Sequence, residues 1–178
     1  MKLIDSFLDK VKVFSLEKHE DSRGFFIEKF HSQRYERFGI NENFKQDNYS
    51  KSKKNVIRGL HFTVNTPQSQ LMTVINGKIF DVIVDIREGL PTFGQYKTFI
   101  LSNEGAQQIY IPHGFAHGFC VLSDEADLHY KTNKFYKAED ERGIIWDDKN
   151  ISINWPIENP KISLKDSKHP SLKDFFSN

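Results

Sequence analysis

The sequence predicts an all-β fold, either a sandwich or a barrel, with a few short helices. Short apolar runs separated by turn signals recur from residue 11 to residue 155, and this pattern is typical of many short strands. Patterns with the helical period are few. The 178 residues fit a single domain over residues 1–178, which would bury roughly 70% of the surface that its unfolded chain exposes.

The N-terminal part of the chain contains a turn, a strand and a short helix. Asp21-Ser22-Arg23-Gly24 is turn-like, and an alternating strand follows it up to Glu28. Taken alone, this stretch is equally consistent with an ordinary hairpin corner that carries a surface arginine. The best helical signal covers residues 32–38, with Ser32 as the expected N-cap.

The clearest hairpin signal is Asn76-Gly77, because this dipeptide suits the positive φ angles of a type I′ turn. It predicts pairing between strands at residues 71–75 and 78–86. In the second strand Asp81 and Asp85 share one face and apolar side chains share the other, since side chains alternate along a strand. We expect the apolar face to be core and the aspartate face to meet a polar cavity.

Further strands are predicted near residues 96–101, 108–111, 118–122 and 127–132. From about residue 157 the chain contains several prolines and lysines, and it is expected to wrap over the barrel as an irregular tail. A short turn is expected within this tail, near residues 172–176. Asp166 lies in the tail, so it can orient a histidine elsewhere only if the tail folds back.

Charge and cysteine content exclude several classes of protein. The 25 basic side chains nearly balance the 24 acidic ones, so nucleic acid is not an expected partner. Cys120 is the only cysteine, which excludes an intrachain disulfide framework and indicates a reducing, cytoplasmic compartment. Acidic residues interrupt the apolar N-terminal stretch, and no apolar run approaches membrane-spanning length. Neither a signal peptide nor a membrane partner is therefore expected.

Arg58–His61 is the first stretch suited to chemistry. Gly59 within an extended run indicates a bulge or a close approach of another backbone, which would re-aim the flanking side chains. Arg58 could then hold a phosphate while His61 takes a proton. A lone histidine is more often a hydrogen-bonded core residue, so this interpretation depends on the other motifs.

Pro112, Gly114 and His117 form a Pro-x-Gly-x-x-His pattern that enters a predicted strand. The pattern resembles the second conserved motif of the cupin superfamily, which implies a jelly roll, or double-stranded β-helix barrel. Metal-binding cupins usually add a His-x-His pair and a glutamate. Here Thr63 stands where the second histidine after His61 would be, so no metal is expected.

Six segments, taken in order, resemble the dTDP-4-dehydrorhamnose 3,5-epimerase family over nearly the whole chain. They are Asp21–Glu28, Gln46–Asn48, Arg58–His61, Phe80–Arg87, Pro112–Phe119 and Gly143–Trp146. The resemblance implies a cofactor-free cupin-type barrel, usually a homodimer, that acts on nucleotide-linked 4-keto-6-deoxyhexoses in deoxysugar biosynthesis for surface polysaccharides. A dTDP-linked sugar is the expected partner.

The resemblance also implies residue roles. His61 matches the catalytic base, Tyr130 the proton donor, and Asp166 the aspartate that supports the base. Contacts with the nucleotide, pyrophosphate or sugar are implied for Arg23, Glu28, Gln46, Asn48, Arg58, His117, Tyr136, Glu141 and Lys165. His113 receives no role.

Simple chemistry supports these roles. The C4 ketone acidifies the hydrogens at C3 and C5, so a neutral imidazole can remove one and leave an enolate. Inversion then needs an acid on the opposite face, and a phenol holds its proton at neutral pH. An aspartate bonded to the imidazole would fix its tautomer. No metal is required if fixed donors stabilise the enolate.

Gln70 is the main departure from the family pattern. Family members commonly carry a lysine in a Gln-x-Lys-Leu pattern, and here the stretch reads Gln68-Ser69-Gln70-Leu71. Losing an oxyanion donor altogether costs on the order of 3 kcal/mol, and exchanging lysine for glutamine should cost less. Besides a 3,5-epimerase of the standard type, two other functions stay open. One is an epimerase that inverts a single centre or uses a CDP- or GDP-linked sugar, and the other is a non-catalytic sugar-nucleotide-binding cupin.

Overall fold

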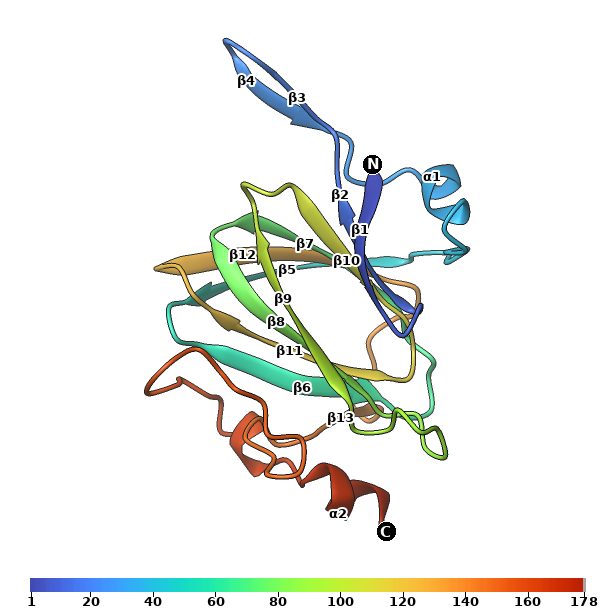
Figure 1. Ribbon diagram of the computed structural model, residues 1–178, viewed down its shortest axis with the longest axis vertical. Coiled ribbons are helices and arrows are strands. Elements are labelled where there is room, and N and C mark those ends of the chain that lie inside the picture. Colours follow the sequence, from blue (N-terminus) through green and yellow to red (C-terminus); the bar gives the residue numbers. More distant parts are fainter. Residues whose placement is uncertain (178) are drawn as a thin grey trace.

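The computed structural model describes residues 1–177, and two antiparallel sheets make up most of it (Figure 1). The six-stranded sheet has the order β1-β2-β10-β7-β12-β5. Its strands are β1 (Lys2–Phe7), β2 (Val11–Ser15), β5 (Gln46–Lys53), β7 (Gln70–Asn76), β10 (Gln107–Ile111) and β12 (Glu125–Thr132). The five-stranded sheet has the order β13-β6-β11-β8-β9. Its strands are β6 (Ile57–Thr63), β8 (Lys78–Asp85), β9 (Tyr96–Ser102), β11 (Phe115–Val121) and β13 (Glu141–Gly143).

The main core lies between the two sheets. Met72 and Leu128 of the six-stranded sheet pack in one cluster with Ile83 and Phe119 of the five-stranded sheet. All four side chains are buried, as the inner faces of two packed sheets require. The all-β prediction and the jelly-roll type of fold are confirmed.

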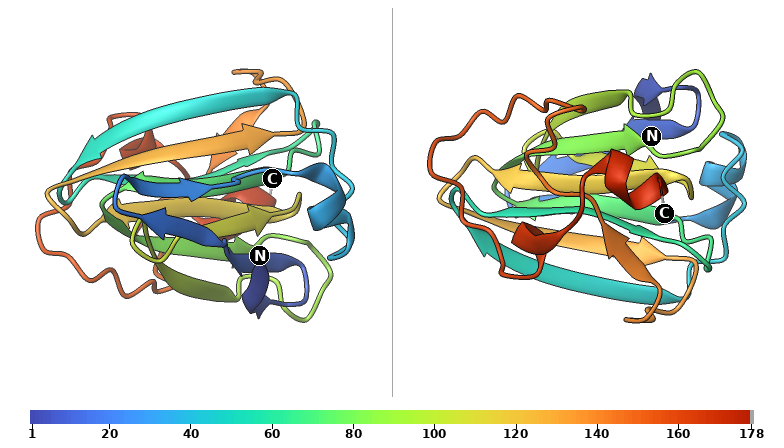
Figure 2. Two further views of the ribbon diagram at one scale, coloured as in Figure 1. Left: turned by 90° about the horizontal axis from the view of Figure 1, so that it is seen from above. Right: turned by 90° about the horizontal axis from the view of Figure 1, so that it is seen from below.

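The C-terminal part of the chain covers the outer face of the five-stranded sheet (Figures 1 and 2). Val82 and Val84 of β8 pack there with Ile144 and with Leu172 of the short helix α2 (Leu172–Phe176). Both faces of β8 are therefore buried. The face predicted to be core meets the C-terminal segment, whereas Asp81 shares the inner face with Ile83 of the main core.

The strands on either side of Asn76-Gly77 occur as predicted, but the hairpin does not. β7 pairs with β10 and β12, whereas β8 pairs with β11 and β9. Of the two turn residues only Gly77 has a positive φ, of 80°, so the type I′ turn is absent. The dipeptide instead carries the chain from one sheet to the other, and a Cβ at Gly77 would collide with the carbonyl of Glu125.

The N-terminal elements lie at the edge of the barrel. The hairpin of β3 (Lys18–Asp21) and β4 (Gly24–Ile27) projects away from both sheets (Figure 1). Helix α1 (Ser32–Glu36) follows, but His31 occupies the N-cap position and makes no side-chain cap hydrogen bond. The prediction of Ser32 as the N-cap was therefore wrong by one residue. Within residues 1–177, no helix is long and apolar enough to cross a membrane.

The close backbone approach predicted at Gly59 is confirmed. The ladder between β6 and β11 changes register between His61 and Arg58, and a Cβ at Gly59 would lie 2.5 Å from the Cα of Gly118. In a regular strand, residues three apart point to opposite faces. Because of this irregularity, Arg58 and His61 line the same cavity.

We expect Gly59→Ala to lower the free energy of unfolding by about 3 kcal/mol, because the new methyl group meets backbone at a φ of 131°. Urea denaturation measures this loss. Gly89→Ala is the matched control, since Gly89 has a φ of 77° and open space around it, and it should cost only about 1 kcal/mol. Equal losses in the two variants would contradict the close contact at Gly59.

Candidate active site

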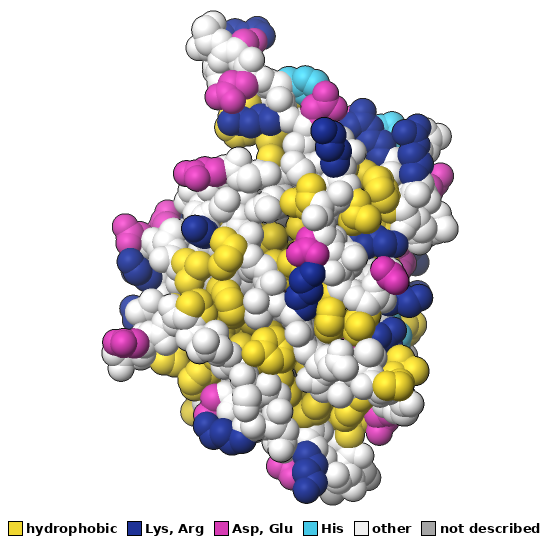
Figure 3. Space-filling view, in the orientation of Figure 1, with side chains coloured by type: hydrophobic (Ala, Val, Ile, Leu, Met, Phe, Trp, Pro, Cys, Tyr) yellow, Lys and Arg dark blue, Asp and Glu magenta, His cyan; other side chains and the backbone are white. Residues whose placement is uncertain are grey.

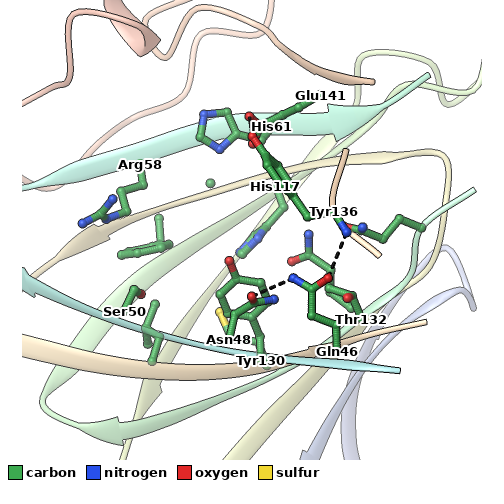
Figure 4. Close-up of a pocket in the computed structure, with 16 residues that line it drawn as sticks. Gln46, Asn48, Ser50, Arg58, His61, His117, Tyr130, Thr132, Tyr136 and Glu141 are labelled. Atoms are coloured by element: carbon green, nitrogen blue, oxygen red, sulfur yellow. Dashed lines mark hydrogen bonds between the residues drawn. The ribbon is translucent and has the colours of Figure 1, made fainter. Parts of the chain in front are cut away.

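A cavity of about 410 Å³ opens between the sheets (Figure 4). Its lining includes many residues singled out from the sequence, namely Gln46, Asn48, Arg58, His61, Gln70, His117, Tyr130, Tyr136 and Glu141. Strand register explains how distant residues meet here. In the six-stranded sheet Tyr130 lies opposite both Asn48 and Met72, and in the five-stranded sheet His117 lies opposite His61.

His61 and Asp166 form a hydrogen-bonded pair at one wall of the cavity. The C-terminal segment folds back so that Asp166, in the 3₁₀ turn η1 (Asp166–Lys168), places Oδ1 3.0 Å from Nε2 of His61. The amide of Gly59 also donates to Asp166, at 3.3 Å. Because a carboxylate only accepts, Nε2 carries the hydrogen and Nδ1 of a neutral His61 keeps the lone pair.

The pKa of the Asp166 carboxyl is lowered to about 2. Burial acts to raise this pKa, but the hydrogen bond and the charge of His61, together with the amide of Gly59, outweigh it. The side chain of Asp166 is 6% exposed. The carboxylate therefore stays ionised throughout the neutral range.

We predict that Asp166 makes stability depend on acid pH. Its folded pKa of about 2 lies below the ordinary value of 3.8, so its stabilisation is present above about pH 4 and is lost as the pH falls toward 2. The expected contribution is about 2 kcal/mol. Urea unfolding of Asp166→Asn and of the parent should differ by this amount at pH 7 and converge near pH 2. Asp124→Asn, at an exposed carboxylate, should follow the parent, and a constant gap for Asp166→Asn would contradict the linkage.

Tyr130 comes from the facing sheet, and Figure 4 shows it across the cavity from His61. Burial raises the pKa of its phenol, and the negative charge of Glu141 adds to this effect against the opposing charge of Arg58. The phenol thus keeps its proton at neutral pH.

His117 forms a second histidine–aspartate pair. Its Nε2 lies 2.7 Å from Oδ1 of Asp81, whose side chain is fully buried. Asp81 has no role in the sequence prediction beyond facing a polar cavity. It reaches the cavity wall through His117, and the other inward aspartate, Asp85, instead pairs with Arg87 and Thr92. The alternation of β8 is the signal that could have found this pair.

Polar side chains form a connected group at another part of the cavity. Gln46 donates to Asn48 at 2.9 Å and accepts from the amide of Tyr136 at 2.9 Å. The Tyr136 hydroxyl donates to Glu141 at 3.2 Å, and Glu141 also pairs with Lys165. Tyr136 lies in the loop beyond β12 and is 55% exposed, so it stands at the mouth of the cavity.

Arg58 and Gln70 complete the polar lining. Arg58 donates from Nε to the hydroxyl of Ser52 at 2.9 Å, and Figure 4 shows its guanidinium at the opposite side of the cavity from Tyr136. Gln70, at the start of β7, lies opposite Thr132 in the ladder. A fixed cation and a neutral amide thus face the same space.

Four residues singled out from the sequence are absent from the cavity lining. Asp166 and Lys165 contact lining residues, His61 and Glu141, whereas Arg23 and Glu28 do not. Arg23 lies in the projecting hairpin and pairs with Asp21 at 2.6 Å, with its side chain 88% exposed. Glu28 follows β4 and pairs with Arg34 at 3.1 Å. Within one chain, neither side chain faces His61 or Tyr130.

His169 belongs to the His61 wall, although no sequence pattern indicated it. Its ring stands 5.6 Å from the His61 ring at an angle of 80°, and its Nε2 lies 3.7 Å from Oδ1 of Asp166. Burial lowers the pKa of His169, and the neighbouring charge of His61 lowers it further. His169 lies in the irregular tail, where neither the strand period of about 2 residues nor the helical period of about 3.6 residues applies.

Comparison with known proteins gives one consistent family. A family model described as dTDP-4-dehydrorhamnose 3,5-epimerase matches residues 6–174. The dTDP-4-dehydrorhamnose 3,5-epimerase of Shigella flexneri is 48% identical over 168 residues, which are 93% of each chain. That of Salmonella typhimurium is 43% identical over 175 residues, which are 97% of this chain and 96% of that one.

Solved structures agree with this result. The dTDP-6-deoxy-D-glucose-3,5-epimerase of Legionella pneumophila, in complex with dTDP-4-keto-L-rhamnose, has a TM-score of 0.93 and 44% identity over 97% of this chain and 93% of that one. A 3'-monoepimerase from Streptomyces bikiniensis, in complex with dTDP-quinovose, has a TM-score of 0.87 and 28% identity over 92% and 84%. With a family model over residues 6–174 and relatives above 40% identity along nearly its full length, the chain belongs to the dTDP-4-dehydrorhamnose 3,5-epimerase family.

Proposed function

We propose that this protein is an isomerase that converts dTDP-4-dehydro-6-deoxy-D-glucose to dTDP-4-dehydro-L-rhamnose by inverting C3 and C5. The observation that carries the proposal is the placement of His61, held by Asp166, across the cavity from a protonated Tyr130. A base and an acid on facing walls suit inversion at a carbon between them. The relatives named above support the nucleotide and the sugar.

His61 is the proposed base. With Nε2–H bonded to Asp166, Nδ1 takes the proton from C3 or C5, and the electron pair of the broken C–H bond moves into the enolate of the C4 ketone. The positive charge that develops on the ring is balanced by the ionised Asp166. Asp166 thus fixes the tautomer and stabilises the protonated base.

Tyr130 is the proposed acid. Its phenol gives a proton to the same carbon from the opposite face, so the enolate collapses to the inverted ketone. The raised pKa of Tyr130 keeps the proton in place until the enolate forms. Solvent then returns a proton to the tyrosinate and removes the proton from His61, and a second cycle at the other carbon completes the reaction.

The enolate oxygen needs hydrogen-bond donors, and we assign this role to Gln70 and His117. Both line the cavity. His117 is held by the buried Asp81, which fixes the orientation of its ring in the cavity wall. An amide at Gln70 donates without a charge, so His117 supplies part of what a lysine would give.

The nucleotide end of the substrate is assigned to the polar residues around Tyr136. The exposed phenol ring can stack on the base, and Gln46 and Asn48 can meet polar groups of the nucleoside. Arg58 and Lys165 offer cations for the pyrophosphate. In this arrangement Glu141 orients both Tyr136 and Lys165.

We also propose that the protein is a homodimer, in which the β3–β4 hairpin of each chain reaches its partner. The side chains of Phe25 and Phe26 in this hairpin are 64% and 67% exposed. Figure 3 shows further hydrophobic side chains at the surface of the barrel below the hairpin. Arg23 and Glu28 would then act at the cavity of the second chain. Sedimentation analysis should give twice the monomer mass, and Phe25→Asp with Phe26→Asp should shift the protein toward the monomer.

Deuterium incorporation tests the proposed reaction. With the dTDP-linked substrate in deuterated water, NMR should show solvent deuterium at both C3 and C5. Label at one carbon only would identify a single-centre epimerase, a reaction supported by the likeness to the Streptomyces bikiniensis 3'-monoepimerase. CDP- and GDP-linked substrates, assayed in parallel, test the nucleotide. Absence of label at both carbons with bound substrate would refute epimerisation.

The neutral Gln70 keeps one further function open, that of a non-catalytic sugar-nucleotide-binding cupin. If the protein is an epimerase, Gln70→Lys should raise kcat by about 5-fold, because hydrogen bonds to charged groups contribute about 1 kcal/mol more than neutral ones. Gln70→Met, which removes the donor, should lower kcat. An inactive parent in which only Gln70→Lys turns over would instead indicate the binding protein.

A further inference from the structure

His61, Asp166 and His169 bring three metal-ligating atoms together behind the proposed base. One nitrogen from each histidine and one oxygen of Asp166 all lie within 4.8 Å of one another. Nε2 of His169 is buried and has no hydrogen-bond partner among residues 1–177. This nitrogen lies 3.7 Å from Oδ1 of Asp166, which is too far for a hydrogen bond. A buried polar atom without a hydrogen bond costs free energy.

We propose that these three side chains form a binding site for a zinc-type divalent transition-metal ion, and that the bound ion switches off the base. Two imidazoles and a carboxylate are a donor set that such ions prefer, whereas Mg²⁺ and Ca²⁺ prefer sets made of oxygen alone. An open position remains for water. The site is distinct from that of metal-binding cupins, because Asp166 and His169 come from the C-terminal segment and not from the strands of the barrel.

The distances suit such an ion. Zinc binds nitrogen and oxygen at about 2.0–2.1 Å, so two ligands at a tetrahedral ion lie about 3.3 Å apart. The Oδ1 of Asp166 lies 3.0 Å from Nε2 of His61 and 3.7 Å from Nε2 of His169. Both separations are close to this value, and the two histidine nitrogens lie within 4.8 Å of each other.

Gly143 is what allows His169 to reach this position. A Cβ at residue 143 would collide with the His169 ring at Nε2, and Gly143 lies opposite His61 in the ladder between β13 and β6. Its φ is not in the left-handed region, so alanine fits the backbone there. Gly143→Ala should therefore displace the His169 ring without altering any of the three ligands.

The effect on His61 follows from its tautomer and rests on the function proposed above. When an ion takes Nε2, the single proton of the neutral ring moves to Nδ1. Nδ1 is the atom assigned to accept the proton from the sugar, and with a hydrogen of its own it cannot do so. The bound ion also occupies the Asp166 oxygen that would balance the charge of a protonated base. Binding of the ion and proton abstraction thus exclude each other.

Direct binding tests the site without any assay of turnover. Chelator-treated protein is titrated calorimetrically with ZnCl₂, and Co²⁺ serves as a spectroscopic probe through its visible absorption bands. We expect one ion per chain, and a loss of affinity of at least about 10-fold in His169→Ala and in Gly143→Ala. His113→Asn, at an exposed histidine of a nearby loop, should bind as the parent does. No saturable binding, or binding that neither variant weakens, would overturn the site.

Turnover tests the switch. Zn²⁺ should inhibit the parent at the concentrations at which it binds, MgCl₂ at equal ionic strength should not, and chelator should restore full activity. The turnover of His169→Ala, whatever its value without metal, should not fall at the Zn²⁺ concentrations that inhibit the parent. Binding in the titration without inhibition would overturn the switch but leave the metal site in place. Failure of the proposed epimerase reaction would appear separately, as a parent that is inactive after chelator treatment.

Discussion

Replacing His61 by asparagine is expected to lower kcat by about 10²–10⁴-fold, the usual contribution of a positioned general base. Asparagine keeps a polar side chain near Asp166 but cannot take a proton at neutral pH. Substrate binding should change little, because the nucleotide contacts assigned to Tyr136 and Arg58 are untouched. Steady-state kinetics give kcat, and NMR in deuterated water should show that label no longer enters C3 or C5.

The matched control for this variant is His31→Asn. The same chemical change is made at an exposed histidine before α1 that makes no side-chain cap hydrogen bond, and kcat should stay within about 2-fold of the parent, as for surface substitutions in general. A His61→Asn enzyme that retains turnover and deuterium exchange would refute the assignment of the base. Equal melting temperatures for the two variants exclude misfolding as the cause of a loss.

Replacing Tyr130 by phenylalanine should separate proton removal from inversion. The variant lacks only the phenolic oxygen, so His61 can still remove a proton and return one from solvent on the same face. We expect kcat for epimerisation to fall by about 10²-fold or more, while deuterium still enters the substrate with its configuration retained. NMR distinguishes these outcomes, because it reports both label and configuration at each carbon.

Tyr49→Phe is the control for the second variant. Tyr49 is 63% exposed on β5, beside the inward-facing Asn48, so its hydroxyl points away from the cavity and its loss should leave both rates unchanged. Epimerisation at the parental rate by Tyr130→Phe would show that another group delivers the proton. If Tyr130→Phe lost both deuterium exchange and epimerisation, the phenol would also hold the substrate in place.

Local pattern located the strands well but could not identify their partners. The strands predicted near residues 96–101 and 127–132 occur as β9 (Tyr96–Ser102) and β12 (Glu125–Thr132). The expected hairpin at Asn76-Gly77 was wrong, because a glycine suits a sheet-to-sheet corner as well as a tight turn. Pairing depends on which faces must be buried together, and that is a property of the whole chain.

The candidate site shows the same division. Side-chain alternation and the unusual glycine in Arg58–His61 are visible in the sequence, and the resemblance to the epimerase family implied His61, Tyr130 and Asp166. The pairs His117 with Asp81 and His169 with Asp166 join residues far apart in the chain or in its irregular tail. The alternation of β8 marks the face on which Asp81 lies but not its partner, because that contact arises only when β8 meets β11. No periodic signal covers the irregular tail that carries Asp166 and His169.

The sequence by itself determined the all-β class, most strand positions and the family, because alternation and ordered motifs are local and survive without knowledge of pairing. Tertiary structure decided which faces became interior, that Arg58 and His61 share a cavity, and that Arg23 and Glu28 lie outside it. It also brought His169 beside the base. These outcomes depend on sheet packing and on two close approaches, of the Gly118 backbone to Gly59 and of the His169 ring to Gly143, where the absence of a Cβ lets distant segments come into contact.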